Sequence, residues 1–347
     1  MQNTYEDIVP LIELTRGDLV ESRHRGAMAV VDSQGNTLAA AGDPQHKAYL
    51  RSAAKPFQAL PTVLSGALDH YGLDQEALAL MCASHYGTEE HVAVVQRILD
   101  TIGLDVSALR CGVHWPLDET ASRRLAAAGL EPDARHSNCS GKHAGMLTLT
   151  RYWGLQDLDY TQPGHPVQLA IRSQVANITD LTDDAIHTAP DGCTVPAFAL
   201  PLSHVALAFA RLMEPDAPPE RRRIVAAMQA YPHLVSGHGE LDDMLMQAGA
   251  GSIVSKGGAE GYQGVGIRTP EGRCVGIALK IEDGAGRARG TAIMAALETL
   301  KLVEPAVLAR LEPLRQPAIK NQRQQVVGVM RAVVDWAGRP AAIEIAA

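Results

Sequence analysis

Ser52 and Lys55 stand three positions apart at the start of an apolar stretch with helical periodicity. On a helix this spacing puts the hydroxyl and the amine on one face. A serine hydroxyl is a weak nucleophile until a neighbouring group removes its proton, and a neutral lysine amine can do this. An ordinary helix start, with the serine as N-cap and the lysine on the surface, produces the same pattern. The pair is therefore a candidate nucleophile and base whose role depends on the rest of the chain.

Two further polar clusters follow this pair, Ser84-His85-Tyr86 and Lys256-Gly257-Gly258. A Ser-x-x-Lys, then a second serine, then Lys-x-Gly is the order found in serine β-lactamases and penicillin-binding proteins. This order favours catalysis by Ser52, and it adds Ser84 and Lys256 to the candidate catalytic residues.

A second constellation combines Cys139 and Lys142, at the start of another helical stretch, with the more distant Cys193. Two thiolates and a nitrogen suit zinc, with water as the fourth ligand. A lysine must lose its proton before it binds a metal, which makes His143 an alternative nitrogen ligand. Cysteines are also among the most commonly buried residues. Spacing alone therefore favours buried thiols over a metal site.

Composition excludes several classes of protein. A chain of 347 residues that is 46% hydrophobic can bury a substantial core. The net charge of −8 and the 4% aromatic content argue against a nucleic-acid partner. There is neither an apolar run of membrane-spanning length nor a recognisable secretion signal. The five cysteines do not suggest a disulfide framework. We therefore expect a cytoplasmic protein that binds neither nucleic acid nor membrane.

The elements that must position these residues follow from periodicity. Alternating and β-branched residues predict strands within 7–41 and again over 252–256, 261–268 and 274–281. Helical periodicity predicts helices over 53–66, 74–83, 88–102, 119–128, 141–153, 165–178, 203–213, 220–230 and about 288–301.

We therefore predict an α/β (α+β) sandwich of the serine β-lactamase type. The N-terminal and C-terminal strands would form one antiparallel sheet, flanked by helices and accompanied by a helical cluster. We expect residues 1–347 to form a single domain, with a helical subregion of about 70–245 inserted between the sheet-forming ends.

Five motifs together resemble the rhizobial-type (class 3) L-asparaginases. They are Arg51-Ser52-x-x-Lys55, the Ser84-His85 segment, Asn138-Cys139-Ser140-Gly141-Lys142-His143, Asp191-Gly192-Cys193 and Lys256-Gly257-Gly258-Ala259-Glu260-Gly261. The resemblance extends from about residue 8 to about residue 335. It implies the serine β-lactamase and serine-dependent glutaminase fold, and the hydrolysis of L-asparagine to L-aspartate and ammonia.

The resemblance also implies catalytic roles. Ser52 resembles the family's nucleophile, Lys55 its base, Ser84 a second active-site serine and Lys256 a second lysine. Lys55 would take the proton of Ser52 directly or through Ser84. To act as a base it needs a pKa well below the ordinary lysine value of about 10.4.

By the same resemblance, one zinc ion per chain would be bound by Cys139, Lys142 and Cys193. The ion would be structural or would organise the substrate pocket. We assign substrate binding to three residues that flank the candidate catalytic and metal-binding residues: Arg51, His143 and Asp191. Arginine binds carboxylates with two parallel hydrogen bonds, although a structural salt bridge is an equally good role for Arg51. We expect the protein to be a homodimer.

Two rival functions stay open on the sequence. A glutaminase or another β-lactamase-fold amidohydrolase would use the same serine and lysines. Glutamine differs from asparagine by one methylene, which a pocket discriminates by only about 1–3 kcal/mol. A non-catalytic zinc-binding protein is the rival from another class, and the presence of all four candidate catalytic residues argues against it.

Overall fold

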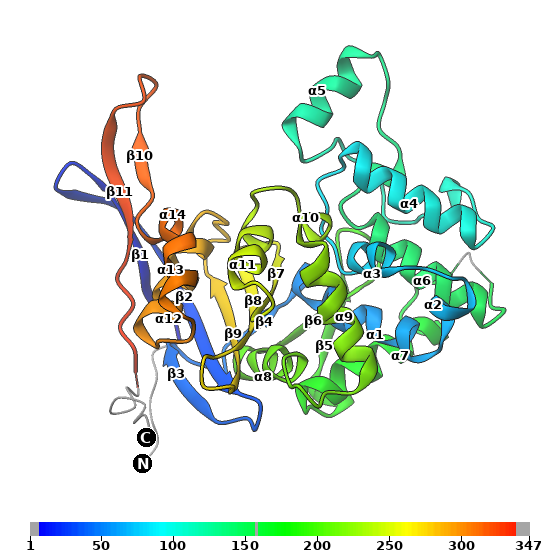
Figure 1. The fold of residues 1–347 in the computed structure, drawn as a ribbon, viewed down its shortest axis with the longest axis horizontal. Helices are drawn as coiled ribbons and strands as arrows, with labels where there is room; N and C mark the ends of the chain where they lie inside the picture. Colours follow the sequence, from blue (N-terminus) through cyan, green and yellow to red (C-terminus); the bar gives the residue numbers. More distant parts are fainter. Residues whose placement is uncertain (1–6, 157–158, 338–347) are drawn as a thin grey trace. The chain divides into compact units, whose positions relative to one another are not determined.

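The computed structural model describes residues 7–156 and 159–337 (Figure 1). The chain divides into two compact units. The first contains the chain up to Leu50, the segment Leu200–Glu214 and the chain from Ala248 onward. The second contains Arg51–Ala199 and Pro215–Gln247. No helix in the described ranges is long and apolar enough to cross a membrane.

An antiparallel sheet is the core of the first unit. Within the described residues it has eight strands, in the order β10-β11-β1-β2-β9-β8-β7, and β3 pairs with β2. The strands are β1 (Val9–Arg16), β2 (Leu19–Asp32), β3 (Thr37–Ala41), β7 (Ile253–Gly258), β8 (Tyr262–Arg268), β9 (Cys274–Ile281), β10 (Ala318–Lys320) and β11 (Val326–Ala332). The short strand β4 (Lys47–Tyr49) also belongs to this unit.

The N-terminal strands β1 and β2 lie between the C-terminal strands β11 and β9 in this sheet. β2 pairs with β9, with Met28 opposite Leu279 and Val30 opposite Ile277. Figure 1 shows the N-terminal strands, in blue, beside the C-terminal ones, in orange and red. The mixed α/β class and the antiparallel sheet of N- and C-terminal strands are therefore confirmed. Periodicity does not predict β10 and β11, whose residues are mostly exposed or half-buried.

Glycines let a helix lie directly on this sheet. The helices of the first unit are α8 (Leu202–Leu212), α12 (Ala288–Thr299), α13 (Pro305–Arg310) and α14 (Glu312–Arg315). A Cβ atom at Gly276 of β9 would lie 1.8 Å from the carbonyl oxygen of Ala206, on α8. A Cβ atom at Gly264 of β8 would lie 2.0 Å from the Phe209 ring. Only glycine allows so close an approach of the helix to the strands.

The second unit is mainly helical. Its elements are η1 (Arg51–Ala54), α1 (Lys55–Leu64), α2 (Ala67–His70), α3 (Gln75–Met81), α4 (Glu89–Thr101), η2 (Val106–Ala108), α5 (Glu119–Ala127), η3 (Ala134–His136), α6 (Ser140–Tyr152), α7 (Pro166–Thr179), η4 (Asp183–Ala185), β5 (His187–Pro190), α9 (Pro219–Ala230) and α10 (Pro232–Val235). β6 (Pro196–Pro201) and α11 (Leu241–Gly249) run from this unit into the first.

Each predicted helix corresponds within a few residues to a helix of one of the two units. The strands β5 and β6 are not predicted from the sequence, because both are short and bear prolines. They pair antiparallel, with Thr188 opposite Phe198. The turn between them carries Asp191 and Cys193, two of the candidate site residues.

Candidate active site

Ser52 lies in the 3-10 helix η1, immediately before α1. A 3-10 helix has three residues per turn, so the side chains of Ser52 and Lys55 project from the same side. Lys55 is the first residue of α1 and is completely buried, whereas Ser52 is half-buried. Pro56, in the first turn, has a fixed φ that suits a helix start. The local sequence thus puts a half-buried serine three residues before a completely buried lysine.

The backbone immediately before Ser52 is strained. Arg51 has a φ of +50°, in the left-handed region that non-glycine residues rarely adopt. Such conformations are kept where the surrounding structure enforces them, and they gather at functional sites. The unusual backbone of Arg51 therefore marks this turn as part of a candidate functional site.

The amine of Lys55 has three hydrogen-bond partners, which lie on two segments of the second unit. Its Nζ lies 2.5 Å from the carbonyl oxygen of Ala83 and 3.1 Å from that of Asn138. It lies 3.0 Å from Oγ of Ser84. Ala83 and Ser84 follow α3, and Asn138 precedes α6. Lys55 therefore joins the start of α1 to both of these segments.

The chemical types of these partners fit an amine that accepts a proton. Carbonyl oxygens only accept hydrogen bonds, whereas a serine hydroxyl donates or accepts. A neutral Lys55 can donate its two N–H groups to the carbonyls of Ala83 and Asn138. In that state its lone pair can accept from the hydroxyl of Ser84. The same three contacts also suit the protonated amine, with Ser84 as acceptor, so the site accommodates both states of a general base.

Two buried histidines support the Ser84 segment. The N–H of Gly87 donates to Nδ1 of His85 at 3.1 Å, which assigns the proton of a neutral ring to Nε2. That nitrogen donates to Oγ of Ser140 at 2.7 Å. The His85 ring stacks on His91, with centroids 5.1 Å apart. Burial lowers the pKa of both rings, to about 4 for His91, so both are neutral near pH 7.

Arg51 and Asp191 form an ion pair in the structure. Nε of Arg51 donates to Oδ1 of Asp191 at 2.7 Å. Burial would raise the pKa of Asp191, but the positive charges of Lys142 and Arg51 outweigh it, so the pKa is lowered and the carboxyl stays ionised. Among the described residues, Nε is the Arg51 nitrogen engaged in a hydrogen bond.

The proposed metal ligands Cys139, Lys142 and Cys193 converge in the buried part of the second unit. Nζ of Lys142 lies 2.9 Å from Sγ of Cys193, and the two cysteine side chains share a hydrogen bond. Cys139 caps α6, so Lys142 lies one turn along the same helix. Two thiols and an amine so arranged fit the donor preferences of zinc.

The pKa values of Cys139, Lys142 and Cys193 depend on one another. The hydrogen bond with Cys193 lowers the pKa of Cys139 against the effect of burial, and raises that of Cys193. Burial would lower the pKa of Lys142, but the negative charges of Cys139 and Cys193 outweigh it, so it is raised. The lowered pKa favours the thiolate form of Cys139, and the raised pKa favours the ammonium form of Lys142. Metal binding must displace the Lys142 proton.

His143 follows Lys142 on α6 and is completely buried. Its Nδ1 lies 2.6 Å from the hydroxyl of Tyr160, which also accepts from the N–H of Arg110 at 2.9 Å. Its Nε2 is a buried atom without a hydrogen-bond partner in the described part of the chain. Burial holds the pKa of His143 well below its ordinary value, so the ring is neutral.

Lys256 belongs to the first unit, unlike the other predicted site residues, which all lie in the second. It is buried on β7, and its Nζ donates to the carbonyl oxygen of Gly257 at 2.9 Å.

Sequence reasoning missed several partners in the second unit. The carbonyls of Ala83 and Asn138 have no sequence signal, because every residue has a carbonyl. His114, which accepts a hydrogen bond from the N–H of Asn138 at 2.9 Å, and Tyr160 come from segments with no motif.

Comparison with known proteins gives one family match. A family model described as L-asparaginase II matches residues 12–332. None of the curated proteins matches the chain significantly.

Solved structures give weaker similarities. Mglu in its L-glutamate binding form, in 4.3 M NaCl, is 16% identical, with 80% of this chain and 60% of that chain covered and a TM-score of 0.38. Mglu in its native form, also in 4.3 M NaCl, is 17% identical, with coverages of 80% and 61% and a TM-score of 0.37. The chain spans less than two thirds of these proteins. TM-scores this low do not establish a common fold.

The buried His91 predicts a dependence of stability on pH. Its pKa is about 4 in the folded protein and 6.5 in a model peptide. As the pH falls from about 6.5 to about 4, the unfolded state binds a proton that the folded state does not. Because of His91, the free energy of unfolding should therefore fall by about 1.4 kcal/mol for each unit by which the pH is lowered within this window. Replacement by a non-titrating residue, His91→Gln, should remove this slope.

Urea denaturation at several pH values between about 7 and 5 measures the effect. The exposed His70 provides the control, and His70→Gln should keep the wild-type slope. Equal slopes for the wild type and His91→Gln would contradict the assignment.

Proposed function

Because the chain belongs to the L-asparaginase II family, we propose that this asparaginase-type amidohydrolase converts L-asparagine to L-aspartate and ammonia through an ester on Ser52. One observation carries the proposal. The buried amine of Lys55 lies 3.0 Å from Oγ of Ser84, and Ser52 stands one 3-10 turn before it. A candidate nucleophile, a proton relay and a base are thus gathered in one unit.

In the proposed reaction, Oγ of Ser52 attacks the carbonyl carbon of the side-chain amide. Its proton passes to Ser84 as the Ser84 proton passes to Nζ of Lys55, which becomes an ammonium. When the tetrahedral intermediate collapses, the C–N bond breaks and this proton returns through Ser84 to the leaving nitrogen, releasing ammonia. A water then gives one proton to the same base and attacks the ester carbonyl. The ester C–O bond breaks, the proton returns through Ser84 to Oγ of Ser52, and aspartate is released.

The ion pair of Arg51 and Asp191 lies beside Ser52 in the sequence or by contact, and its two charges suit the two charged groups of the substrate backbone. L-Asparagine carries an α-carboxylate and an α-ammonium group. The Nη groups of Arg51 would bind the carboxylate, since a guanidinium offers parallel donors. The ionised Asp191 would bind the ammonium. His143, which is buried directly after Lys142 on α6, is the third candidate for substrate binding.

Cys139, Lys142 and Cys193 would hold a zinc ion, for which their donor set is suitable. When bound, the ion would supply positive charge that stabilises both thiolates and ties α6 to the turn with Asp191. The nucleophile and base are Ser52 and Lys55, which are not among these ligands.

Replacing the nucleophile tests the function. Ser52→Ala should lower ammonia release from L-asparagine by about 10³-fold or more, because the variant lacks the hydroxyl that forms the ester. The same substitution at an exposed serine on α7, Ser173→Ala, is the matched control and should retain full activity. Ammonia release from L-glutamine, measured in parallel, gives the substrate preference, and we expect asparagine to be hydrolysed faster.

Normal turnover by a folded Ser52→Ala protein would place the nucleophile elsewhere. Absence of ammonia release by the folded wild type from either amide would contradict the proposed function.

Zinc content tests the metal proposal separately. Protein purified without chelator and dialysed against metal-free buffer should retain about one zinc ion per chain. Cys139→Ala and Cys193→Ala should each lose it, because two ligands bind zinc far more weakly than three. Cys82→Ala, which removes another buried thiol, should retain it. Zinc-free wild type, or undiminished zinc in Cys139→Ala, would show that these cysteines are only buried thiols.

A further inference from the structure

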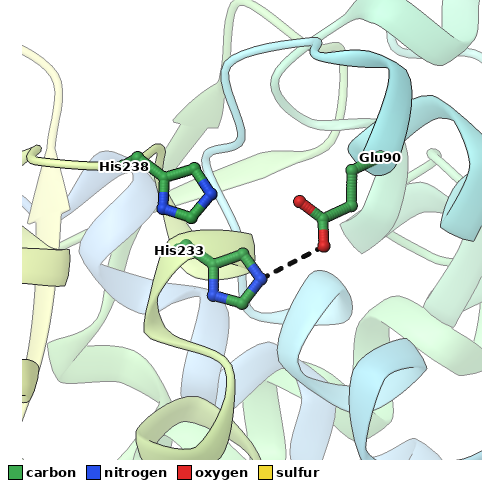
Figure 2. A group of neighbouring side chains, drawn as sticks. All are labelled: Glu90, His233 and His238. Carbon is green, nitrogen blue, oxygen red and sulfur yellow. Dashed lines mark hydrogen bonds and ion pairs between the residues drawn. The ribbon is translucent and has the colours of Figure 1, made fainter.

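A second group of possible metal ligands lies in the same unit, apart from the cysteines. Glu90, His233 and His238 each offer one ligand atom, and these atoms lie within 4.8 Å of one another (Figure 2). Glu90 is in the first turn of α4, and His233 is in α10. His238 lies in the segment between α10 and α11. Neither the proposed reaction nor the cysteine site uses any of the three.

Two of the ligand atoms are separated by a distance close to that between the ligands of a bound zinc ion. Nε2 of His233 lies 3.2 Å from Oε1 of Glu90. Ligands of a tetrahedral zinc ion, at bond lengths of about 2.0–2.1 Å, lie about 3.4 Å apart. The imidazoles of His233 and His238 are stacked, with centroids 4.8 Å apart and planes within 1°. His238 is exposed, so its ring can rotate toward the other two ligands. Figure 2 shows both rings with a nitrogen on the side of the Glu90 carboxylate.

The chemistry of the cluster selects the type of ion. The lone pair of a neutral imidazole nitrogen can bind a metal ion. Two imidazoles and one carboxylate form the donor set of many zinc enzymes, with a position left for water. Calcium and magnesium prefer oxygen ligands, and a site of this kind therefore favours divalent transition metals.

The backbone that carries these ligands is fastened to the segment of Ser84. The N–H of Ser84 donates to the carbonyl oxygen of Val235 at 2.9 Å. Nε2 of His91 lies 3.1 Å from the carbonyl oxygen of His233. A Cβ atom at Gly237 would lie 3.0 Å from Cγ of Tyr86, so the two segments are in close contact.

We propose that Glu90, His233 and His238 bind a divalent transition-metal ion, and that this ion fastens the 84–90 segment to residues 233–238. The ion would add one direct link between α4 and α10 to the contacts already present. The site is independent of the proposed reaction, since binding requires neither Ser52 nor substrate.

Titration with Co²⁺ tests the binding. A His–His–Glu site gives a visible absorption band without the near-ultraviolet charge-transfer band of a cobalt–thiolate bond, which separates it from Cys139 and Cys193. Wild-type protein dialysed against metal-free buffer should bind Co²⁺ with the visible band and without the cobalt–thiolate band, which we call thiolate-free binding. Glu90→Gln and His238→Asn should each weaken it at least tenfold.

Two substitutions serve as matched controls. Glu89→Gln removes the neighbouring negative charge from the same helix turn, and His70→Asn removes an exposed imidazole elsewhere in the unit. Both should leave the Co²⁺ affinity unchanged. Cobalt binding that always carries the thiolate band, or that weakens equally in Glu89→Gln and Glu90→Gln, would overturn the proposal.

Amide hydrogen exchange tests whether the ion links the 84–90 segment to residues 233–238. Saturating Co²⁺ should slow exchange in peptides covering residues 84–91 and 233–240 of the wild type, and have no such effect in His238→Asn. Thiolate-free binding that leaves exchange in both peptides unchanged would show that the ion does not link the segments.

Discussion

The fully buried amine of Lys55 is the constraint around which the second unit is arranged. An amine removed from water costs several kcal/mol unless hydrogen bonds replace its solvation. Three groups on two segments supply those bonds: the carbonyl of Ala83 and the hydroxyl of Ser84 after α3, and the carbonyl of Asn138 before α6. If any of them moved away, the amine would lose a partner without gaining water. The position of Ser52, one turn before Lys55, depends on the same arrangement.

This constraint connects the two constellations that the sequence presents separately. Asn138, whose carbonyl accepts from Lys55, is followed directly by Cys139. Arg51, directly before Ser52, is paired with Asp191, two residues before Cys193. The candidate nucleophile and the candidate metal ligands are thus joined through two short pieces of backbone. An ion bound at the cysteines would act on the serine through these links, by holding Asp191 and Arg51 in place.

Local patterns predicted most of the elements, because periodicity reports which face of an element is buried. The predicted strand 274–281 coincides with β9, and the predicted helix 88–102 contains α4. The strands β5 and β6 were missed because they are too short to show a period. Residue type and order pointed to Ser52, Lys55 and Ser84. The carbonyl partners of Lys55, and the convergence of Glu90 with His233 and His238, depend on contacts between distant segments, which spacing does not contain.

The central claim is that Ser52, and not Ser84, forms the bond to the substrate. Ser84 is the serine in direct hydrogen bond with Lys55, so it is the natural competitor. Peptide mapping by mass spectrometry, on enzyme quenched during turnover of L-asparagine, tests the claim most directly. The account predicts an aspartyl ester on the peptide that contains Ser52 and an unmodified Ser84. An ester on Ser84 would contradict it.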